Sequence, residues 1–309
     1  MLGGKNISSK VIGENAPPAL HDYNERILNR GSVNMFTNPF SDLTQLNIST
    51  EIMQGYIVLM ALLVIIGTVL DMMHKKSAKY FFEDAKKAKK NATRTVSSGE
   101  KAGLALKTLA NEVLTSGEFC NMKRRISHLL TMYGFIIFVA TSAMMIFSGN
   151  VASSSLAVFW HLGAIMLCLG GYSFWFVIRV DVAAEGTKWY HLVKADIFIV
   201  SLFTTATFAL LWSFTSGGLS LLFFGLFLVS NTIIFASVFW SKFAHMFFKP
   251  AAALQKRIAQ ADGSNLNLPG DFDLTDPAVQ AKFPDIPQYM GTNPENMGAG
   301  IRRESPNHY

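Results

Sequence analysis

The sequence alternates between long apolar stretches and polar ones. Five stretches approach the roughly 20 apolar residues that cross a hydrocarbon core of about 30 Å. They are Ile52–Met73, Leu129–Phe147, Leu156–Ile178, Ile197–Phe214 and Leu219–Trp240. With their flanking turns they predict spans over 51–73, 127–147, 156–178, 190–214 and 219–248. The pattern therefore predicts an all-α integral membrane protein with a bundle of five transmembrane helices.

The composition excludes several classes of protein. Charged types make up 16% of the 309 residues, against roughly 25% in soluble globular proteins. Only two cysteines occur, Cys120 and Cys168, so neither a disulfide framework nor a four-cysteine zinc or iron–sulfur site can form from this chain alone. The motifs GxxxxGK[ST], GxGxxG, CxxC, HExxH and GxSxG are absent. A stand-alone soluble enzyme is therefore not expected.

The basic residues gather in one loop and predict the orientation. Residues 74–126 hold 13 Lys or Arg and 5 acidic residues, whereas the connections 148–156 and 215–218 carry no charge. Loops on the cytoplasmic side carry the Lys and Arg excess. We therefore predict a periplasmic N-terminal segment over 1–50, a cytoplasmic loop and C-terminus, and a multi-pass protein of the cytoplasmic (inner) membrane. Because the net charge of +6 arises in this loop, no nucleic-acid partner is expected.

The parts outside the predicted spans suggest contacts with lipid or protein. In the loop, Ser77–Ala92 and Glu100–Leu114 have helical spacing, which fits an amphipathic surface on anionic lipid or a docking surface for a soluble partner. A short helix is predicted over 250–262. The tail 263–309 contains six of the ten prolines and no apolar periodicity. It is either disordered or extended along a partner.

The histidines are the main candidates for chemistry. His128, His191 and His245 all fall near the predicted inner interface, whereas His161 has no second histidine at its depth. A six-coordinate b-type haem needs one imidazole from each of two facing helices. One haem on the inner side is compatible with these positions, and an outer haem is not. Each histidine also fits a simpler interpretation as a polar residue at the membrane interface.

A second group of polar residues lies at the predicted start of the fourth span. His191, Lys194 and Asp196 could supply hydrogen bonds to a quinone headgroup and a proton route. The alternative for Lys194 is that its ammonium group extends to the lipid headgroups. Both interpretations remain open at this point.

Two sequence runs resemble membrane cytochrome b subunits. Arg124–Phe135 (RRISHLLTMYGF) and Phe239–His245 (FWSKFAH) are similar to helix ends in subunits of the nitrate reductase gamma type and related quinone-interacting oxidoreductases. The resemblance implies an inner haem held by His128 and His245. At the positions of the family's outer haem ligands, this chain has Phe138 and Phe227.

A closer resemblance covers roughly residues 120–260 and the tail. Phe248–Ile258 (FKPAAALQKRI) and Gly298–Tyr309 (GAGIRRESPNHY) are similar to the membrane anchor subunits of dissimilatory adenylylsulfate reductases from sulfur-oxidising bacteria. This family implies a cytoplasmic flavin and iron–sulfur partner that oxidises sulfite with AMP, and electron transfer to the quinone pool. The alternative is a structural scaffold without a cofactor.

Overall fold

The computed structural model describes residues 38–41, 48–117, 119, 121–148, 154–181, 186–239, 245–266, 268 and 277–282. Every regular element in these ranges is a helix. Most of the predicted N-terminal segment 1–50 and of the tail 263–309 lies outside them; within the tail, a short helix, α10, covers Pro277–Lys282.

Within the described ranges, five helices are long and apolar enough to cross a membrane, which confirms the prediction of five spans. They are α2 (Thr50–Lys75), α5 (Met122–Ser148), α6 (Ser154–Ser173) with its π-helical continuation η4 (Phe174–Ile178), α7 (Ile197–Phe214) and α8 (Gly217–Ala236). The chain is thus a multi-pass membrane protein by the length and composition of its helices.

Two of the predicted boundaries differ from the structure. The fourth span was predicted from residue 190, but a 3₁₀ turn, η5 (Lys194–Asp196), precedes α7. The fifth span was predicted to run to residue 248, but α8 ends at Ala236. A new helix, α9 (His245–Ala261), contains Pro250, which was expected near the start of the short helix 250–262. Apolar composition continues through this break, so hydropathy alone could not locate it.

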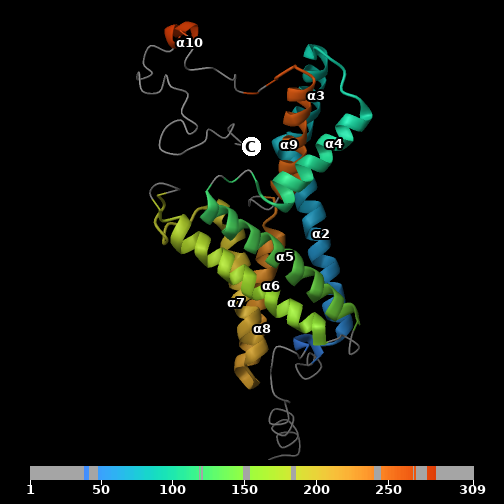
Figure 1. Cartoon of the computed structure of the whole chain (residues 1–309). Coiled ribbons are helices and arrows are strands. Elements are labelled where there is room, and N and C mark those ends of the chain that lie inside the picture. Colours follow the sequence, from blue (N-terminus) through green and yellow to red (C-terminus); the bar gives the residue numbers. More distant parts are fainter. Residues whose placement is uncertain are drawn as a thin grey trace, which may run out of the picture.

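The helices form two antiparallel pairs, α5 with α6 and α7 with α8, and α6 packs against α7 (Figure 1). Helix α2 lies at the side of this group and contacts α8 and α5. Its buried positions Met53, Met60, Gly67 and Asp71 follow one helix face, and most of its remaining surface is exposed apolar side chains. Such a surface suits contact with acyl chains.

Small residues bring α5 and α6 into close contact. A Cβ atom added to Gly134 would lie 2.9 Å from the Gly163 carbonyl oxygen and 2.9 Å from the Leu167 nitrogen. The Ser127 hydroxyl donates a 2.8 Å hydrogen bond to the Gly170 carbonyl across the same interface. Membrane helices commonly associate through small residues and polar contacts of this kind, because lipid provides little hydrophobic driving force between them.

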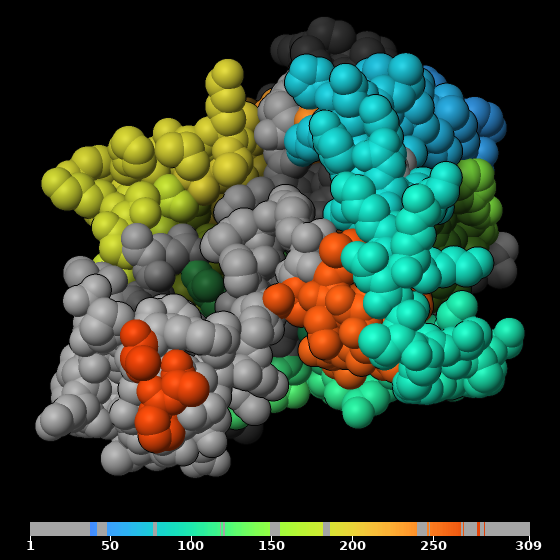
Figure 2. Space-filling view, turned by 90° about the horizontal axis from the view of Figure 1, so that it is seen from above, coloured from blue at the N-terminus to red at the C-terminus, as the bar shows by residue number. Residues whose placement is uncertain are grey.

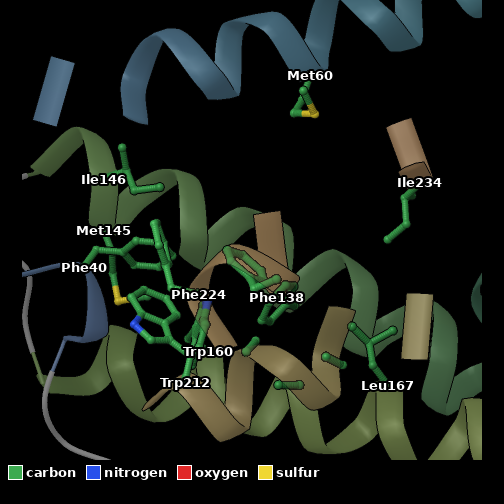
Figure 3. Packing of buried hydrophobic residues seen from close by; sticks show 14 of the residues in the cluster. Phe40, Met60, Phe138, Met145, Ile146, Trp160, Leu167, Trp212, Phe224 and Ile234 are labelled. Atoms are coloured by element: carbon green, nitrogen blue, oxygen red, sulfur yellow. The ribbon is translucent and has the colours of Figure 1, made fainter. Parts of the chain in front are cut away.

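Aromatic rings fill the bundle at the end where α2 begins. Trp160 from α6 and Trp212 from α7 pack at 6.2 Å between ring centroids, and Phe138 from α5 joins them (Figure 3). Phe227 from α8 stacks on Trp212. Phe40 precedes the first span, and its ring centroid lies 5.9 Å from that of Trp160 and 5.2 Å from that of Trp212. The chain before α2 therefore contributes to the core of the bundle.

The opposite end of the bundle carries a helical cap, defined here as α3 (Ser77–Asn91), α4 (Ser98–Thr108), its π-helical continuation η2 (Leu109–Leu114), and α9. These helices extend beyond the bundle (Figure 1) and pack on one another (Figure 2). An ion pair of 2.6 Å joins Arg257 of α9 to Glu112 of η2. Both stretches that were predicted to be helical in the basic loop are helical in the structure. Helix α9 packs against α3, α4 and η2.

The end of α9 is joined to the connection between α3 and α4. The backbone nitrogens of Thr93 and Arg94 donate to the Asp262 carbonyl at 2.9 and 3.2 Å. Arg94 in turn holds the pKa of the Glu100 carboxyl below its ordinary value, chiefly through their hydrogen bond. This junction connects parts of the chain about 170 residues apart in sequence.

Replacing Gly263 by alanine is expected to weaken the cap. Gly263 has φ +76°, and an added Cβ would collide with the Thr93 hydroxyl oxygen and lie 3.3 Å from the Thr93 Cβ. The left-handed conformation alone costs a non-glycine residue roughly 1 kcal/mol. We predict faster hydrogen exchange in 93–97 and 258–262 for Gly263→Ala. Gly103→Ala is the matched control, because nothing lies within 4 Å of that added Cβ, and it should leave the exchange of these segments unchanged.

Candidate functional site

The candidate residues lie at one end of the bundle. His128 is in the second turn of α5, Lys194 and Asp196 precede α7, and His245 begins α9. All three helix starts are at the end that bears the cap (Figure 1). The structure thus brings these elements to the same end of the bundle. Of the side chains that it describes, those of His128 and Asp196 contact different partners, Ser116 and Arg179.

Asp196 forms a buried ion pair with Arg179. Arg179 Nη1 and Nη2 donate to the two carboxylate oxygens of Asp196 at 2.9 and 2.6 Å, and both residues are at most 5% exposed. The Val193 nitrogen donates to the same carboxylate at 3.0 Å, and the guanidinium lies 4.4 Å from the centre of the Trp175 ring. Bidentate pairs of this geometry are strong and directional. The Asp196 carboxylate therefore fixes the connection between α6 and α7.

His191 and Lys194 have exposed side chains on that connection. Both residues were predicted to lie within the fourth span, 190–214, but neither belongs to α7. The His191 carbonyl accepts a 2.7 Å hydrogen bond from Arg179 Nη2. Arg179 thereby holds the backbone at His191 directly, and its partner Asp196 holds the backbone at Val193, next to Lys194. Arg179 is therefore a positioning residue for the side chains of His191 and Lys194.

His128 lies where the bundle meets the cap. Its Nδ1 is 2.9 Å from the hydroxyl oxygen of Ser116, a fully buried residue with φ +47°. The centroid of its ring lies 4.9 Å from that of Phe119. The ammonium group of Lys249 lies 5.1 Å from the centre of the same Phe119 ring. The second turns of α5 and α9 therefore both contact Phe119.

This arrangement bears on the predicted haem ligands, His128 and His245. A hydrogen bond at Nδ1 is the usual way in which a histidine is oriented to offer Nε2 to a metal, so the Ser116 contact is compatible with a ligand role for His128. His245 begins α9, but its side chain lies outside the described part of the structure. Within the described ranges, no three His, Cys, Asp or Glu side chains gather as a metal site.

Other polar residues occupy structural positions. The His161 ring is buried between α6 and α7, where Nδ1 is 2.7 Å from the Ala157 carbonyl oxygen and Nε2 is 3.1 Å from the Ser213 hydroxyl. Phe138 and Phe227, which the sequence resemblance would align with outer haem ligands, pack edge to face at 6.3 Å. Both rings therefore belong to the packed core of the bundle.

Sequence reasoning missed several residues of this region. Arg179 was not among the candidate residues, although Arg179 and Asp196 carry opposite charges and flank the connection between two predicted spans. Asp71 was not considered at all. It is 2% exposed in α2, and Lys75 Nζ lies 2.6 Å from its Oδ1, outside the angles of a hydrogen bond. Its spacing of four residues from Lys75 was visible in the sequence.

The part of the chain that the structure describes is that of a multi-pass membrane protein with five candidate spans and a basic helical cap at one end. Comparison with protein-family models, curated proteins and solved structures finds no match for this chain.

Proposed function

We propose that this protein is the membrane anchor and electron-transfer subunit of a cytoplasmic flavin and iron–sulfur oxidoreductase, of the adenylylsulfate reductase type that works in sulfite oxidation. The soluble partner would dock on the cap, and its electrons would pass to quinone in the membrane. The proposal takes the cap to be cytoplasmic, as the Lys and Arg excess of its loop predicts. It rests on the sequence resemblance and on the form of the cap.

The observation that carries the proposal is that the basic loop and the chain after α8 fold together outside the bundle. Helix α3 packs on α9, where the Gln255 side chain donates to the Phe81 carbonyl at 3.3 Å. On its exposed side α3 presents Lys86, Lys87, Lys89 and Lys90. A folded, cationic surface beyond the spans is suited to an acidic protein partner. It favours docking over the alternative in which these helices lie flat on lipid.

The docking step can be tested with the full chain in nanodiscs and purified adenylylsulfate reductase. We expect binding that weakens with salt, and an affinity about tenfold lower when Lys86, Lys87, Lys89 and Lys90 are all replaced by glutamine, since exposed charge pairs contribute roughly 0.2–1 kcal/mol each. The control, Lys188→Gln with Lys194→Gln, changes charge outside the cap and should leave binding unchanged. No binding, or equal binding by the four-lysine variant, would contradict the proposed docking surface.

In the redox step, His191 and Lys194 are the exposed groups proposed to contact the quinone headgroup and to transfer protons. Arg179 and Asp196 would hold the backbone that carries them. A haem between His128 and His245, which the resemblance implies, would supply a one-electron carrier when bound. His128 would orient toward such a group through its contact with Ser116.

A second candidate function is a structural scaffold without a cofactor. It is favoured by the polar groups that already have protein partners, notably Asp196 with Arg179 and His161 with Ser213. Replacing both His191 and Lys194 by glutamine separates the two functions. We expect partner-dependent quinone reduction to fall at least tenfold while partner binding persists, because a lost hydrogen bond to a charged group costs about 1.5–3 kcal/mol. Unchanged quinone reduction would favour the scaffold.

A further inference from the structure

A strip of exposed aromatic side chains leads from the third span onto the connection before α7. This aromatic strip consists of Tyr172, Phe176, Trp189 and Tyr190, which are 37%, 50%, 56% and 60% exposed. Neighbouring rings are in contact, with centroid distances of 6.1 Å from Tyr172 to Phe176, 6.4 Å from Phe176 to Trp189 and 5.6 Å from Trp189 to Tyr190. Of the tryptophans that the structure describes, only Trp189 is exposed.

Cationic side chains accompany the outer part of the strip. Lys188 Nζ lies 5.7 Å from the centre of the Tyr190 ring, and the side chains of His191 and Lys194 are exposed on the same connection. Leu192, between them, is 64% exposed. The connection therefore combines aromatic and aliphatic surface with two lysines, the composition found where a protein meets the headgroup layer.

This surface is held in place from within the protein. The Thr187 nitrogen donates to the Arg179 carbonyl at 2.9 Å, and the Arg179 guanidinium binds both the His191 carbonyl and the Asp196 carboxylate. Since a buried ion pair fixes both ends of the connection, its apolar side chains are presented in a defined conformation. They are not exposed merely because a loop is loosely packed.

The position of the strip indicates what covers it. Tyr172 and Phe176 belong to a span, so their exposed faces meet acyl chains, and Trp189 and Tyr190 continue the same surface toward the end of the bundle. Figure 2 shows the yellow stretch that includes this connection at the rim of the molecule, away from α3 and α4. A partner seated on the cap would therefore leave it uncovered.

We propose that residues 186–192 form a binding element for anionic phospholipid, in which Trp189, Tyr190 and Leu192 enter the interface and Lys188 contacts the headgroup phosphate. Its function would be to fix the depth and rotation of the α6–α7 pair in the leaflet at the cap end. This inference does not depend on electron transfer.

The test titrates phosphatidylglycerol into the full chain in neutral detergent and follows tryptophan fluorescence. We expect saturable binding that phosphatidylcholine and free glycerol phosphate do not reproduce. Lys188→Gln should lower the apparent affinity about fivefold, the effect of one lysine near an anionic surface. The control pair Lys86→Gln and Lys87→Gln should not change the affinity.

A second measurement places the aromatic side chains. In vesicles with brominated acyl chains, quenching of the wild type should exceed that of Trp189→Phe, because Trp189 is expected at the interface. The proposal is overturned if Trp189→Phe is quenched as much as wild type, if phosphatidylcholine binds equally well, or if Lys188→Gln leaves the affinity unchanged. Burial of the connection only after a soluble protein is added would show a protein interface and would also overturn it.

Discussion

Substituting alanine for Gly134 is expected to destabilise the bundle by about 1–3 kcal/mol, the usual cost of overpacking a well-packed interior. The added methyl group would meet the backbone of α6 at Gly163 and Leu167, both at 2.9 Å, and a backbone cannot move aside as a flexible side chain can. Helices α5 and α6 would have to separate. Thermal unfolding of the full chain in detergent, followed by circular dichroism, measures the change.

The control is a glycine of the same bundle with open space around it. A Cβ added to Gly225 in α8 has no atom within 4 Å. Gly225→Ala should therefore stabilise by up to about 1 kcal/mol, because alanine has the higher helix propensity. Replacement of glycine by alanine is thus predicted to lower the stability of the bundle at Gly134 and to raise it at Gly225. Equal effects would show that α5 and α6 do not pack through Gly134.

Breaking the Arg179–Asp196 ion pair is expected to have the largest effect of any single substitution at the candidate site. Replacing Asp196 by leucine leaves a buried guanidinium without its carboxylate, and removal of one partner from a buried pair costs about 3–5 kcal/mol. The Val193 nitrogen would lose its acceptor at the same time. We expect a lower unfolding temperature and faster hydrogen exchange over 186–196.

The double variant with leucine at both positions provides the control. Apolar replacement of both partners leaves no unpaired charge, so most of the lost stability should return. A double variant as unstable as the sum of the two single variants would contradict the ion pair, because independent residues contribute additively.

The spans could be predicted from the sequence because roughly 20 consecutive apolar residues have few uses other than crossing a membrane. The basic loop could also be predicted from the sequence, as could the helices within it. The end of α8 at Ala236 was not, since the residues that follow are also apolar. Phe40 was missed as well, because its place between Trp160 and Trp212 depends on contacts more than 100 residues away in sequence.

The candidate site was less predictable for a physical reason. The helical wheel assigns faces only within a helix, and residues 190–193 precede η5 and α7. The wheel therefore could not show that Asp196 turns toward Arg179 at the end of the preceding helix. Nor could it show the Ser116 contact of His128, which depends on a left-handed backbone at Ser116 in the connection before α5.

The most direct test of the account is quinone reduction in a reconstituted system. Vesicles that contain the full chain and a quinone are mixed with purified adenylylsulfate reductase, sulfite and AMP, and quinone absorbance is followed. We predict that quinone is reduced only when the chain, the reductase, sulfite and AMP are all present. If the reductase binds these vesicles and oxidises sulfite with a soluble acceptor while the quinone stays oxidised, the chain holds the enzyme at the membrane but does not conduct its electrons.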